Sequence, residues 1–211
     1  MPCRLCGMVL EDDVMRSVLI SIQPKWCELI AGGKKTIEIR KTKPKLETPF
    51  KVYIYCTKSK KHFLQSRSNM FFYCEDKDFI GGHGAGAYQR LNGKVIGEFV
   101  CDEIECFTTD YRANREQTER ISKQSCVSWL GMAEYEYNSH CLYAWHISNL
   151  VIYDKPRELV EFQKPCIRDC NCGGCENAYF THDYGFEGCA LEEGLTRPPQ
   201  SWCYVESGDG E

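Results

Sequence analysis

The stretch that most constrains this chain is residues 32–45, GGKKTIEIRKTKPK. Its centre alternates in polarity and predicts a short strand, with Ile37 and Ile39 on one face and Glu38 and Arg40 on the other. Six cationic side chains surround Glu38, the one acid of the stretch. Two interpretations stay open at this point: a ligand-binding site, or an exposed edge strand whose mixed charge aids solubility.

The residues before this stretch predict a strand followed by a helix. An apolar strand is expected over residues 18–22, and Pro24 suits the first turn of a helix because its missing N–H is not needed there. The apolar spacing of Trp26, Leu29 and Ile30 then predicts a core-facing helical stripe. The two glycines end this helix, one of them in the left-handed cap conformation.

The later segments predict mainly strands, with one helix. Residues 51–57 alternate, with Tyr53 and Tyr55 forming an aromatic second face. The other expected elements are a strand over 94–107 kinked near Gly97, a helix over 125–136, a strand over 142–153 ended by Pro156, a helical turn after it, and a docking strand within 198–205. This order lacks the regular strand–helix alternation of a doubly wound sheet and predicts an α+β or small-barrel fold.

Charge and composition divide the 211 residues into three parts. We expect an N-terminal appendage over 1–16, a main domain over 17–163 with an insertion at about 58–92, and a Cys-rich, acidic segment over 164–211. Residues 34–61 hold ten Lys or Arg and two Glu, about +8, whereas residues 171–211 hold eight acids and one Arg, about −7. A basic face suits a polyanion, although the two segments could also neutralise each other.

No apolar run approaches the roughly 18 residues of a membrane helix. The first sixteen residues also lack the apolar core of a secretory signal. We therefore expect a cytoplasmic protein with no membrane partner. The oligomeric state does not follow from the sequence.

The pattern Gly33-x-Lys35-x-x-Glu38-x-Arg40 resembles the G-x-K-x-x-E-x-R motif of the ASCH domain, a relative of the PUA domain. The segments LNGKVIGEFVCDEI and YAWHISNLVIYDKPREL look like later strands of bacterial and phage-borne ASCH proteins. The resemblance covers about residues 18–162. It implies a PUA-like small β-barrel with a helix beside a cleft, and a cleft, lined by the motif, that holds RNA or a nucleotide.

The motif residues have side chains that suit such a ligand. Lys35 is a compact cation for a phosphate, and Arg40 offers a planar fork for a phosphate or a base edge. Glu38 either accepts from a base amine or holds Arg40 in place. Four aromatic side chains nearby could stack on a base: Tyr53, Tyr55, Trp145 and His146. For Trp145, packing in the core is the better interpretation. Trp145 and His146 alternate in facing, so at most one of them points into a given cleft.

The resemblance also raises an enzymatic alternative. Some small bacterial ASCH proteins are amidohydrolases acting on acetylcytidine, and some are reported to cleave RNA. The amidohydrolase-type motif has a lysine matching Lys35 but a threonine in place of Glu38, so this chain departs from it. Lys35 with Glu38 and Glu98 could still carry acid–base chemistry. A binding module is the leading hypothesis, and a protein–protein adaptor from a mobile element is a third.

Fifteen cysteines without an export signal favour thiols or metal ligands over disulfides. The C-x-x-C pair Cys172 and Cys175 could complete a structural zinc site with His182 and Cys189. Alternative ligands come from two further cysteine pairs: Cys166 with Cys170, and Cys3 with Cys6. Free thiols and a redox pair are the other interpretations of these cysteines.

Overall fold

The computed structural model describes residues 16–68, 70–75, 89–110, 114–165, 178–181, 185–189 and 194–206. In the last two short strands before residue 194, only the backbone is described. No helix in the described part of the chain is long and apolar enough to cross a membrane.

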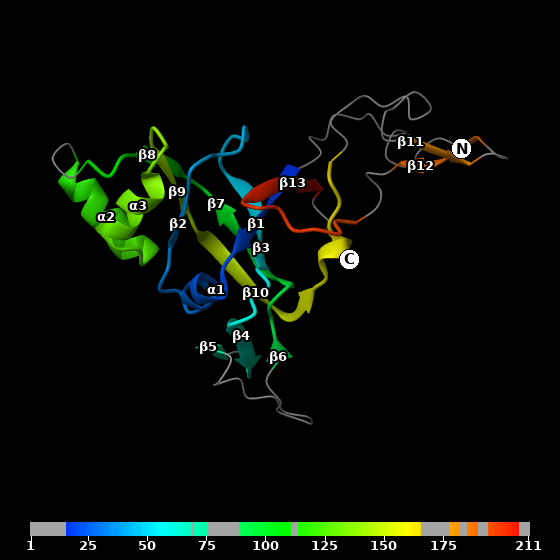
Figure 1. The fold of residues 1–211 in the computed structure, drawn as a ribbon, viewed down its shortest axis with the longest axis horizontal. Coiled ribbons are helices and arrows are strands. Elements are labelled where there is room, and N and C mark those ends of the chain that lie inside the picture. Colours follow the sequence, from blue (N-terminus) through cyan, green and yellow to red (C-terminus); the bar gives the residue numbers. More distant parts are fainter. Residues whose placement is uncertain are drawn as a thin grey trace.

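A five-stranded mixed sheet forms the centre of the molecule (Figure 1). Its strands, in spatial order, are β10 (Ser148–Arg157), β7 (Val95–Cys101), β3 (Phe50–Cys56), β1 (Arg16–Ile22) and β13 (Trp202–Glu206). β1 and β3 are parallel, and the other neighbours are antiparallel. The C-terminal strand β13 pairs with the N-terminal β1, as expected for a docking strand.

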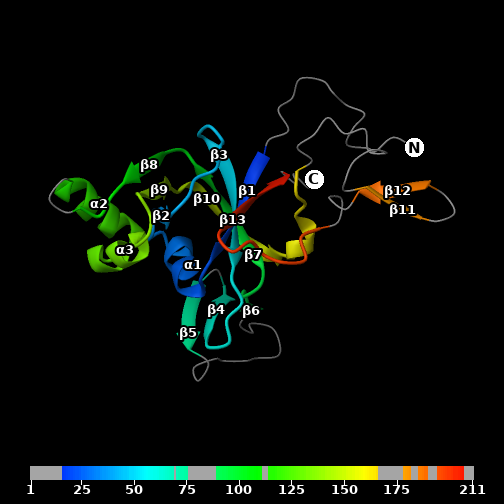
Figure 2. The same ribbon diagram turned by 45° about the horizontal axis from the view of Figure 1, so that its top comes forward.

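A second, three-stranded antiparallel sheet packs beside the first (Figure 2). Its strands are β2 (Ile37–Arg40), β9 (Leu142–His146) and β8 (Ile104–Phe107). Helices α2 (Arg115–Ser125) and α3 (Trp129–Glu136) cover one side of this sheet. Helix α1 (Pro24–Ala31) lies between the two sheets, close to β2.

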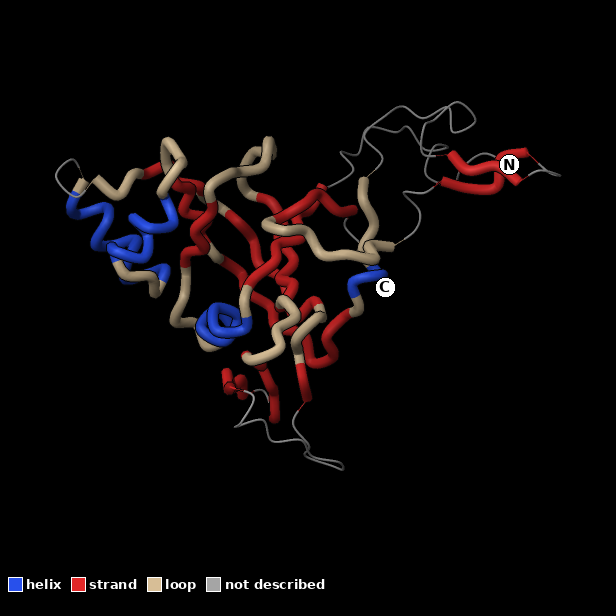
Figure 3. The backbone as a smooth tube through the Cα atoms, in the orientation of Figure 1, coloured by secondary structure: helices blue, strands red, loops and turns tan. Residues whose placement is uncertain are grey.

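Two small sheets project from this body (Figure 3). The first lies within the expected insertion and contains β4 (His62–Arg67), β5 (Met70–Glu75) and β6 (Gln89–Arg90), with β4 and β5 packed against α1. The second is a hairpin of β11 (Ala178–Thr181) and β12 (Gly185–Cys189). The glycine run at 81–87 lies outside the described residues.

Apolar side chains gather in three cores. The first lies between the two main sheets and includes Ile20, Ile54 and Trp145. The second covers the opposite face of the five-stranded sheet and contains Tyr53 and Tyr55. The third lies between β2, β9 and helices α2 and α3. The two faces of the central sheet are therefore both covered, but by different segments.

The turn from α1 into β2 follows the sequence expectation. Pro24 occupies the first turn of α1, and Gly33 adopts φ +68°, a left-handed conformation that favours glycine. The buried stripe of α1 differs from the expected one, because Cys27 joins Ile30 in the core while Trp26 is only half-buried. Trp26 thereby remains available to line a cavity.

The sequence analysis merged or missed several elements. The expected strand over 94–107 is two strands, β7 and β8, in different sheets, and the strand over 142–153 divides into β9 and β10. β10 continues past Pro156 to Arg157. Helix α2 was not anticipated, because its polar sequence buries only Thr118, Ile121 and Ser125. The described strands form an α+β arrangement of separate sheets, and their pairing does not close into the expected barrel.

Candidate ligand-binding cavity

A cavity of about 490 Å³ opens between α1, β2 and α3. Its polar side is built from three side chains of the 32–45 stretch, Lys35, Glu38 and Arg40. Its remaining wall is lined mainly by apolar and aromatic side chains: Ile22, Trp26, Ile39, Val127, Met132 and Tyr135. An apolar cavity with a few convergent polar groups is the usual form of a small-ligand site.

Lys35 lies deep in this wall, with 2% of its surface exposed. Its Nζ atom lies 3.2 Å from Oε2 of Glu38 and donates to the backbone oxygen of Ser125 at 2.7 Å. The ammonium also lies 5.1 Å from the centre of the Trp26 ring, a cation–π distance. A buried lysine costs free energy unless its charge is paired, and these contacts supply the pairing.

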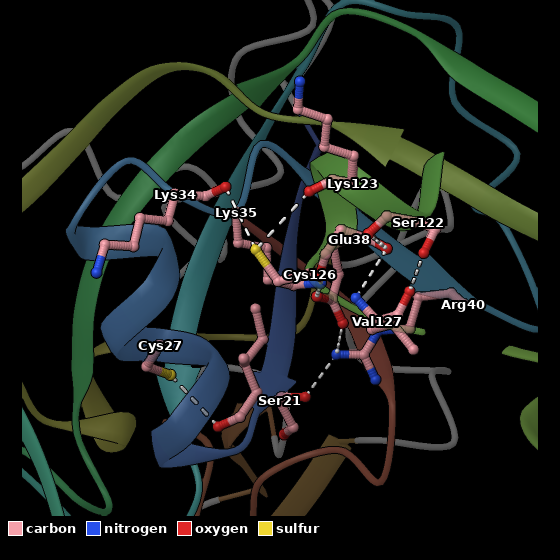
Figure 4. A network of polar contacts seen from close by, with 12 residues as sticks. Ser21, Cys27, Lys34, Lys35, Glu38, Arg40, Ser122, Lys123, Cys126 and Val127 are labelled. Atoms are coloured by element: carbon pink, nitrogen blue, oxygen red, sulfur yellow. Dashed lines mark hydrogen bonds and ion pairs between the residues drawn. The ribbon is translucent and has the colours of Figure 1, made fainter. Parts of the chain in front are cut away.

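Glu38 joins Lys35 to Arg40 (Figure 4). Nη2 of Arg40 lies 3.0 Å from Oε1 of Glu38 and donates to the backbone oxygen of Ser21 at 2.7 Å. Nε of Arg40 is buried and has no hydrogen-bond partner among the described residues. A buried donor without an acceptor is uncommon in native proteins.

The basic loop that follows β2 is held in place by the C-terminal strand. Nε1 of Trp202 donates to Oγ1 of Thr42 at 3.0 Å, and the Tyr204 hydroxyl accepts from the Lys45 backbone N–H at 2.7 Å. Gln200, just before β13, lines the cavity itself. The last described segment of the chain therefore helps to build a site whose motif lies near the beginning.

Cys27 lies in the first core, on the helix that borders the cavity. Burial raises the pKa of this thiol well above its usual range, and the neighbouring Cys56 raises the pKa further. A thiol with a raised pKa is a poor nucleophile. Cys27 therefore packs as a small apolar side chain.

The predicted stacking residues are not brought to the cavity. Tyr53 and Tyr55 are each 1% exposed and pack in the second core, on the other face of the central sheet. Tyr55 was assigned to ligand binding, and the closed core makes that assignment wrong. Trp145 is fully buried in the first core, where it contacts Phe50 edge-on, so core packing is confirmed for this residue.

Glu98 and His146 also lie away from the cavity. Glu98 accepts a hydrogen bond from the Tyr153 hydroxyl and lies 3.5 Å from Nζ of Lys51, so it is not placed to assist Lys35. Burial and the Glu98 carboxylate raise the pKa of Tyr153. His146 follows Trp145 on β9 and bonds Oε1 of Glu105 at 2.6 Å. The proposed roles of Glu98 in catalysis and His146 in ligand binding are therefore both corrected.

One group of described side chains has the composition of a metal site. Ligand atoms of Glu103, Glu105 and His146 lie within 4.8 Å of one another. However, Arg120 and Gln117 bind Oε2 of Glu105 while His146 binds Oε1, so both oxygens already have donors. We interpret this group as an ion-pair network that joins β8 and β9 to α2.

The cysteine-rich zinc site stays a prediction. Three of its four expected ligands, Cys172, Cys175 and His182, lie outside the described residues, and only the backbone of Cys189 is described, in β12. The alternative ligands also lie outside the described residues: Cys166, Cys170, Cys3 and Cys6. Metal analysis of protein purified without a chelator would check for one zinc per chain.

Comparisons with known proteins identify the family of this chain. A model of the ASCH domain matches residues 20–156, and the chain belongs to this family. The crystal structure of ASCH from Zymomonas mobilis is 18% identical over 70% of this chain and 76% of that one, with a TM-score of 0.45. A mutant form of the Zymomonas mobilis protein is 14% identical over 93% and 92% of the two chains, with a TM-score of 0.51. No curated protein matches.

Several cavity residues escaped the sequence analysis. Trp26 was assigned to the core, and Ser21, Met132, Tyr135 and Gln200 were not singled out. Tyr135 lies in the expected 125–136 helix, but nothing in its spacing shows that this helix lines the same cavity as α1.

Proposed function

We propose that this protein binds RNA or a nucleotide in the cavity beside α1. The observation that carries the proposal is the meeting of two cationic side chains, Lys35 and Arg40, with one carboxylate, Glu38, at the wall of a cavity of about 490 Å³. The excess of cationic groups favours an anionic ligand such as a phosphate. ASCH domains are RNA-binding-like modules in general, which supports the same ligand class.

The apolar part of the cavity complements these charges. Trp26 and Tyr135 offer aromatic faces to a base, and Met132 and Val127 add apolar wall. The Arg40 guanidinium, 11% exposed at its side chain, lies beside this wall. A nucleotide has the matching parts, a flat base and an anionic phosphate. The two cations exceed the one carboxylate of this wall, so an anionic ligand suits it better than a neutral apolar one.

Binding of the four ribonucleoside 5′-monophosphates at low salt tests the proposal. We expect quenching of tryptophan fluorescence, because Trp26 lines the cavity, and heat release by calorimetry. Arg40→Ala should lower the affinity at least about tenfold, as is typical for loss of a charged hydrogen bond. Lys34→Ala is the matched control, because Lys34 is exposed and does not line the cavity. Equal affinities for the two variants would remove the cavity as the binding site.

Lys35→Ala provides a second variant for the same experiment. Its loss leaves Glu38 with Arg40 as its remaining cation, so folding must be checked by circular dichroism before binding is measured. Trp26→Phe should bind as the parent does in calorimetry while losing most of the fluorescence change. A folded Lys35→Ala protein that binds every monophosphate with unchanged affinity would contradict a phosphate role for Lys35.

Hydrolysis is a second candidate, favoured by one observation. Lys35 and Glu38 are both buried and 3.2 Å apart, a distance that permits proton transfer between them. Against it, Glu38 also binds Arg40, and no other carboxylate lines the described part of the cavity. Incubation with acetylcytidine and with labelled RNA tests this alternative. Turnover that Lys35→Ala abolishes would support hydrolysis, and its absence would leave binding as the function.

A further inference from the structure

Ser21, in the wall of the cavity, contacts both the cavity arginine and the C-terminal part of the chain. Its backbone oxygen accepts from Nη2 of Arg40 at 2.7 Å (Figure 4). Its backbone N–H donates to the Ser201 oxygen at 2.9 Å, and its hydroxyl donates to the Pro199 oxygen at 2.6 Å. Three polar groups of one buried residue therefore join Arg40 to residues 199–201.

Residues 199–206, here called the C-terminal latch, combine these contacts with strand β13. Gln200 lines the cavity, and the Tyr204 hydroxyl accepts from the backbone N–H of Lys45 in the loop after β2. β13 is an edge strand, and among the described strands it pairs with β1 alone. The latch lies outside residues 20–156, which the ASCH model matches, so the family match by itself does not imply these contacts.

Two acceptors fix the Arg40 guanidinium, and the latch holds one of them. Nη2 of Arg40 lies 3.0 Å from Oε1 of Glu38 and 2.7 Å from the Ser21 oxygen. Glu38 lies on the same strand as Arg40, whereas Ser21 lies on β1, in the other main sheet. A guanidinium donates in a rigid planar fork, so the position of the Ser21 oxygen sets the direction of its other N–H groups. Displacement of the latch therefore changes what Arg40 presents to the cavity.

We propose that Ser21 is a positioning residue, through which the C-terminal latch holds Arg40 in its binding position. Docking of the latch and binding in the cavity are then coupled. The cavity with the latch undocked binds its ligand less tightly, by the same factor by which a bound ligand favours docking. This coupling rests on the proposed function, because the occupant of the cavity is the nucleotide inferred there.

Cys203 reports whether the latch is docked. It lies on β13, opposite Leu19 on β1, and packs against the second core. Burial raises the pKa of this thiol to about 11, so it reacts slowly while β13 stays paired. Cys101 is the matched control, because it lies on β7 of the same sheet and burial raises its pKa to about 12. Alkylation of the intact protein with iodoacetamide, followed by peptide mass spectrometry, measures both rates.

The ligand-free protein tests the link between Arg40 and the latch. Arg40→Ala should raise the alkylation rate of Cys203 about fivefold, the factor for one hydrogen bond, and leave that of Cys101 unchanged. Lys35→Ala is the control, because Lys35 belongs to the same charged cluster but bonds the end of α2. An unchanged Cys203 rate in Arg40→Ala overturns the inference, whether or not any ligand binds.

Ser21→Ala provides a second variant, which decides if Arg40→Ala raises the rates of both thiols by loosening the whole sheet. Loss of the hydroxyl that binds the Pro199 oxygen should raise the Cys203 rate about fivefold. Ser21→Thr, which keeps the hydroxyl, should be alkylated as the parent is. An unchanged Cys203 rate in Ser21→Ala would show that Ser21 does not hold the latch.

The four ribonucleoside 5′-monophosphates test the coupling to the ligand. At saturating concentration they should slow the alkylation of Cys203 in the parent at least about fivefold, and by a smaller factor in Ser21→Ala, with Cys101 unchanged. Monophosphates that bind without slowing Cys203 overturn the coupling and leave the cavity proposal intact. If none of them binds, the proposed function fails, and the Cys203 rate in Arg40→Ala alone decides whether the latch positions Arg40.

Discussion

Two glutamates of this protein, Glu38 and Glu98, each lie close to a lysine, but their surroundings differ. Glu38 is 8% exposed at its side chain, and its partners Lys35 and Arg40 are 2% and 11% exposed. Glu98 and its partner Lys51 are 24% and 26% exposed, at 3.5 Å. Glu38 faces a cavity, whereas Glu98 bonds Tyr153 on the other face of the central sheet. The same two residue types, Glu and Lys, therefore form both the pair at the cavity and the pair away from it.

The difference arises from segments that cover the two faces. The face with Tyr53 and Tyr55 is closed by Leu159, Phe162 and Leu195, from parts of the chain more than 100 residues away in sequence. The side with Glu38 is bordered by α1 and α3, which leave space between them. The position of a polar group relative to such space decides whether it can meet a ligand.

The largest effect we expect is on the stability of the Glu38 cluster. Glu38→Ala leaves two buried cations without their carboxylate, so the free energy of unfolding should fall by about 3–5 kcal/mol. Glu98→Ala should cost about 1–2 kcal/mol, because its pair with Lys51 is partly exposed and only the Tyr153 hydrogen bond is well shielded. Urea unfolding of both variants measures the difference. Equal costs would show that burial does not separate the two glutamates.

The strand and helix around the motif could be predicted because their signals are local. Pro24 sets the start of α1, Gly33 sets its end, and alternation places Ile37 opposite Glu38. The face that stays open could not be predicted in this way. Tyr55 alternates as regularly as Glu38, and only the packing of Phe162 and Leu195 shows that it is closed off. Alternation reports that two faces exist, not what covers them.

A second comparison concerns two glycines, Gly97 in the central sheet and Gly33 in the motif. A Cβ added at Gly97 would lie 2.3 Å from the Val151 backbone oxygen, so Gly97→Ala must displace β10 and should cost about 2–3 kcal/mol. Gly33 has open space around it and φ +68°, so Gly33→Ala should cost about 1 kcal/mol. Thermal unfolding ranks the two. A Gly33→Ala protein that folds but loses nucleotide binding would give the motif glycine a role beyond its backbone conformation.

A third carboxylate, Glu105, extends the comparison to pH. Burial alone raises the pKa of Glu105, but hydrogen bonds from Arg120, His146 and Gln117 more than offset it and lower the pKa from 4.5 to about 2. As the pH falls below about 4.5, Glu105 takes up a proton in the unfolded state but stays ionised in the folded state. The stability that Glu105 contributes above about pH 4.5 is therefore lost as the pH falls toward 2. Glu105→Gln should reduce the fall in the urea midpoint of unfolding as the pH is lowered. If the urea midpoints of the variant and the parent fall in parallel from pH 5 to 2.5, Glu105 is not the group responsible.

The arrangement of the side chains named as candidates was predicted in part. Lys35, Glu38 and Arg40 meet as the motif suggested, but Glu98 and His146 do not join them. His146 illustrates why: it is next to Trp145, and their alternation sends it toward Glu105 on the opposite face of β9. Tyr135 lies in the cavity wall because of how α3 packs, and no local signal in the sequence predicts that packing.

The smallest effect that we expect is the stability change on substituting the N-cap residues of α3 and α2. The Ser128 hydroxyl accepts from the Gly131 backbone N–H at 3.2 Å and caps α3, whereas Asn114 makes no side-chain cap at α2. Ser128→Ala should therefore cost about 1 kcal/mol, and Asn114→Ala a few tenths. Because α3 carries Met132 and Tyr135 into the cavity wall, Ser128→Ala should also weaken nucleotide binding slightly, and Asn114→Ala should not. Equal binding by both variants would mean that the cavity wall does not depend on the cap of α3.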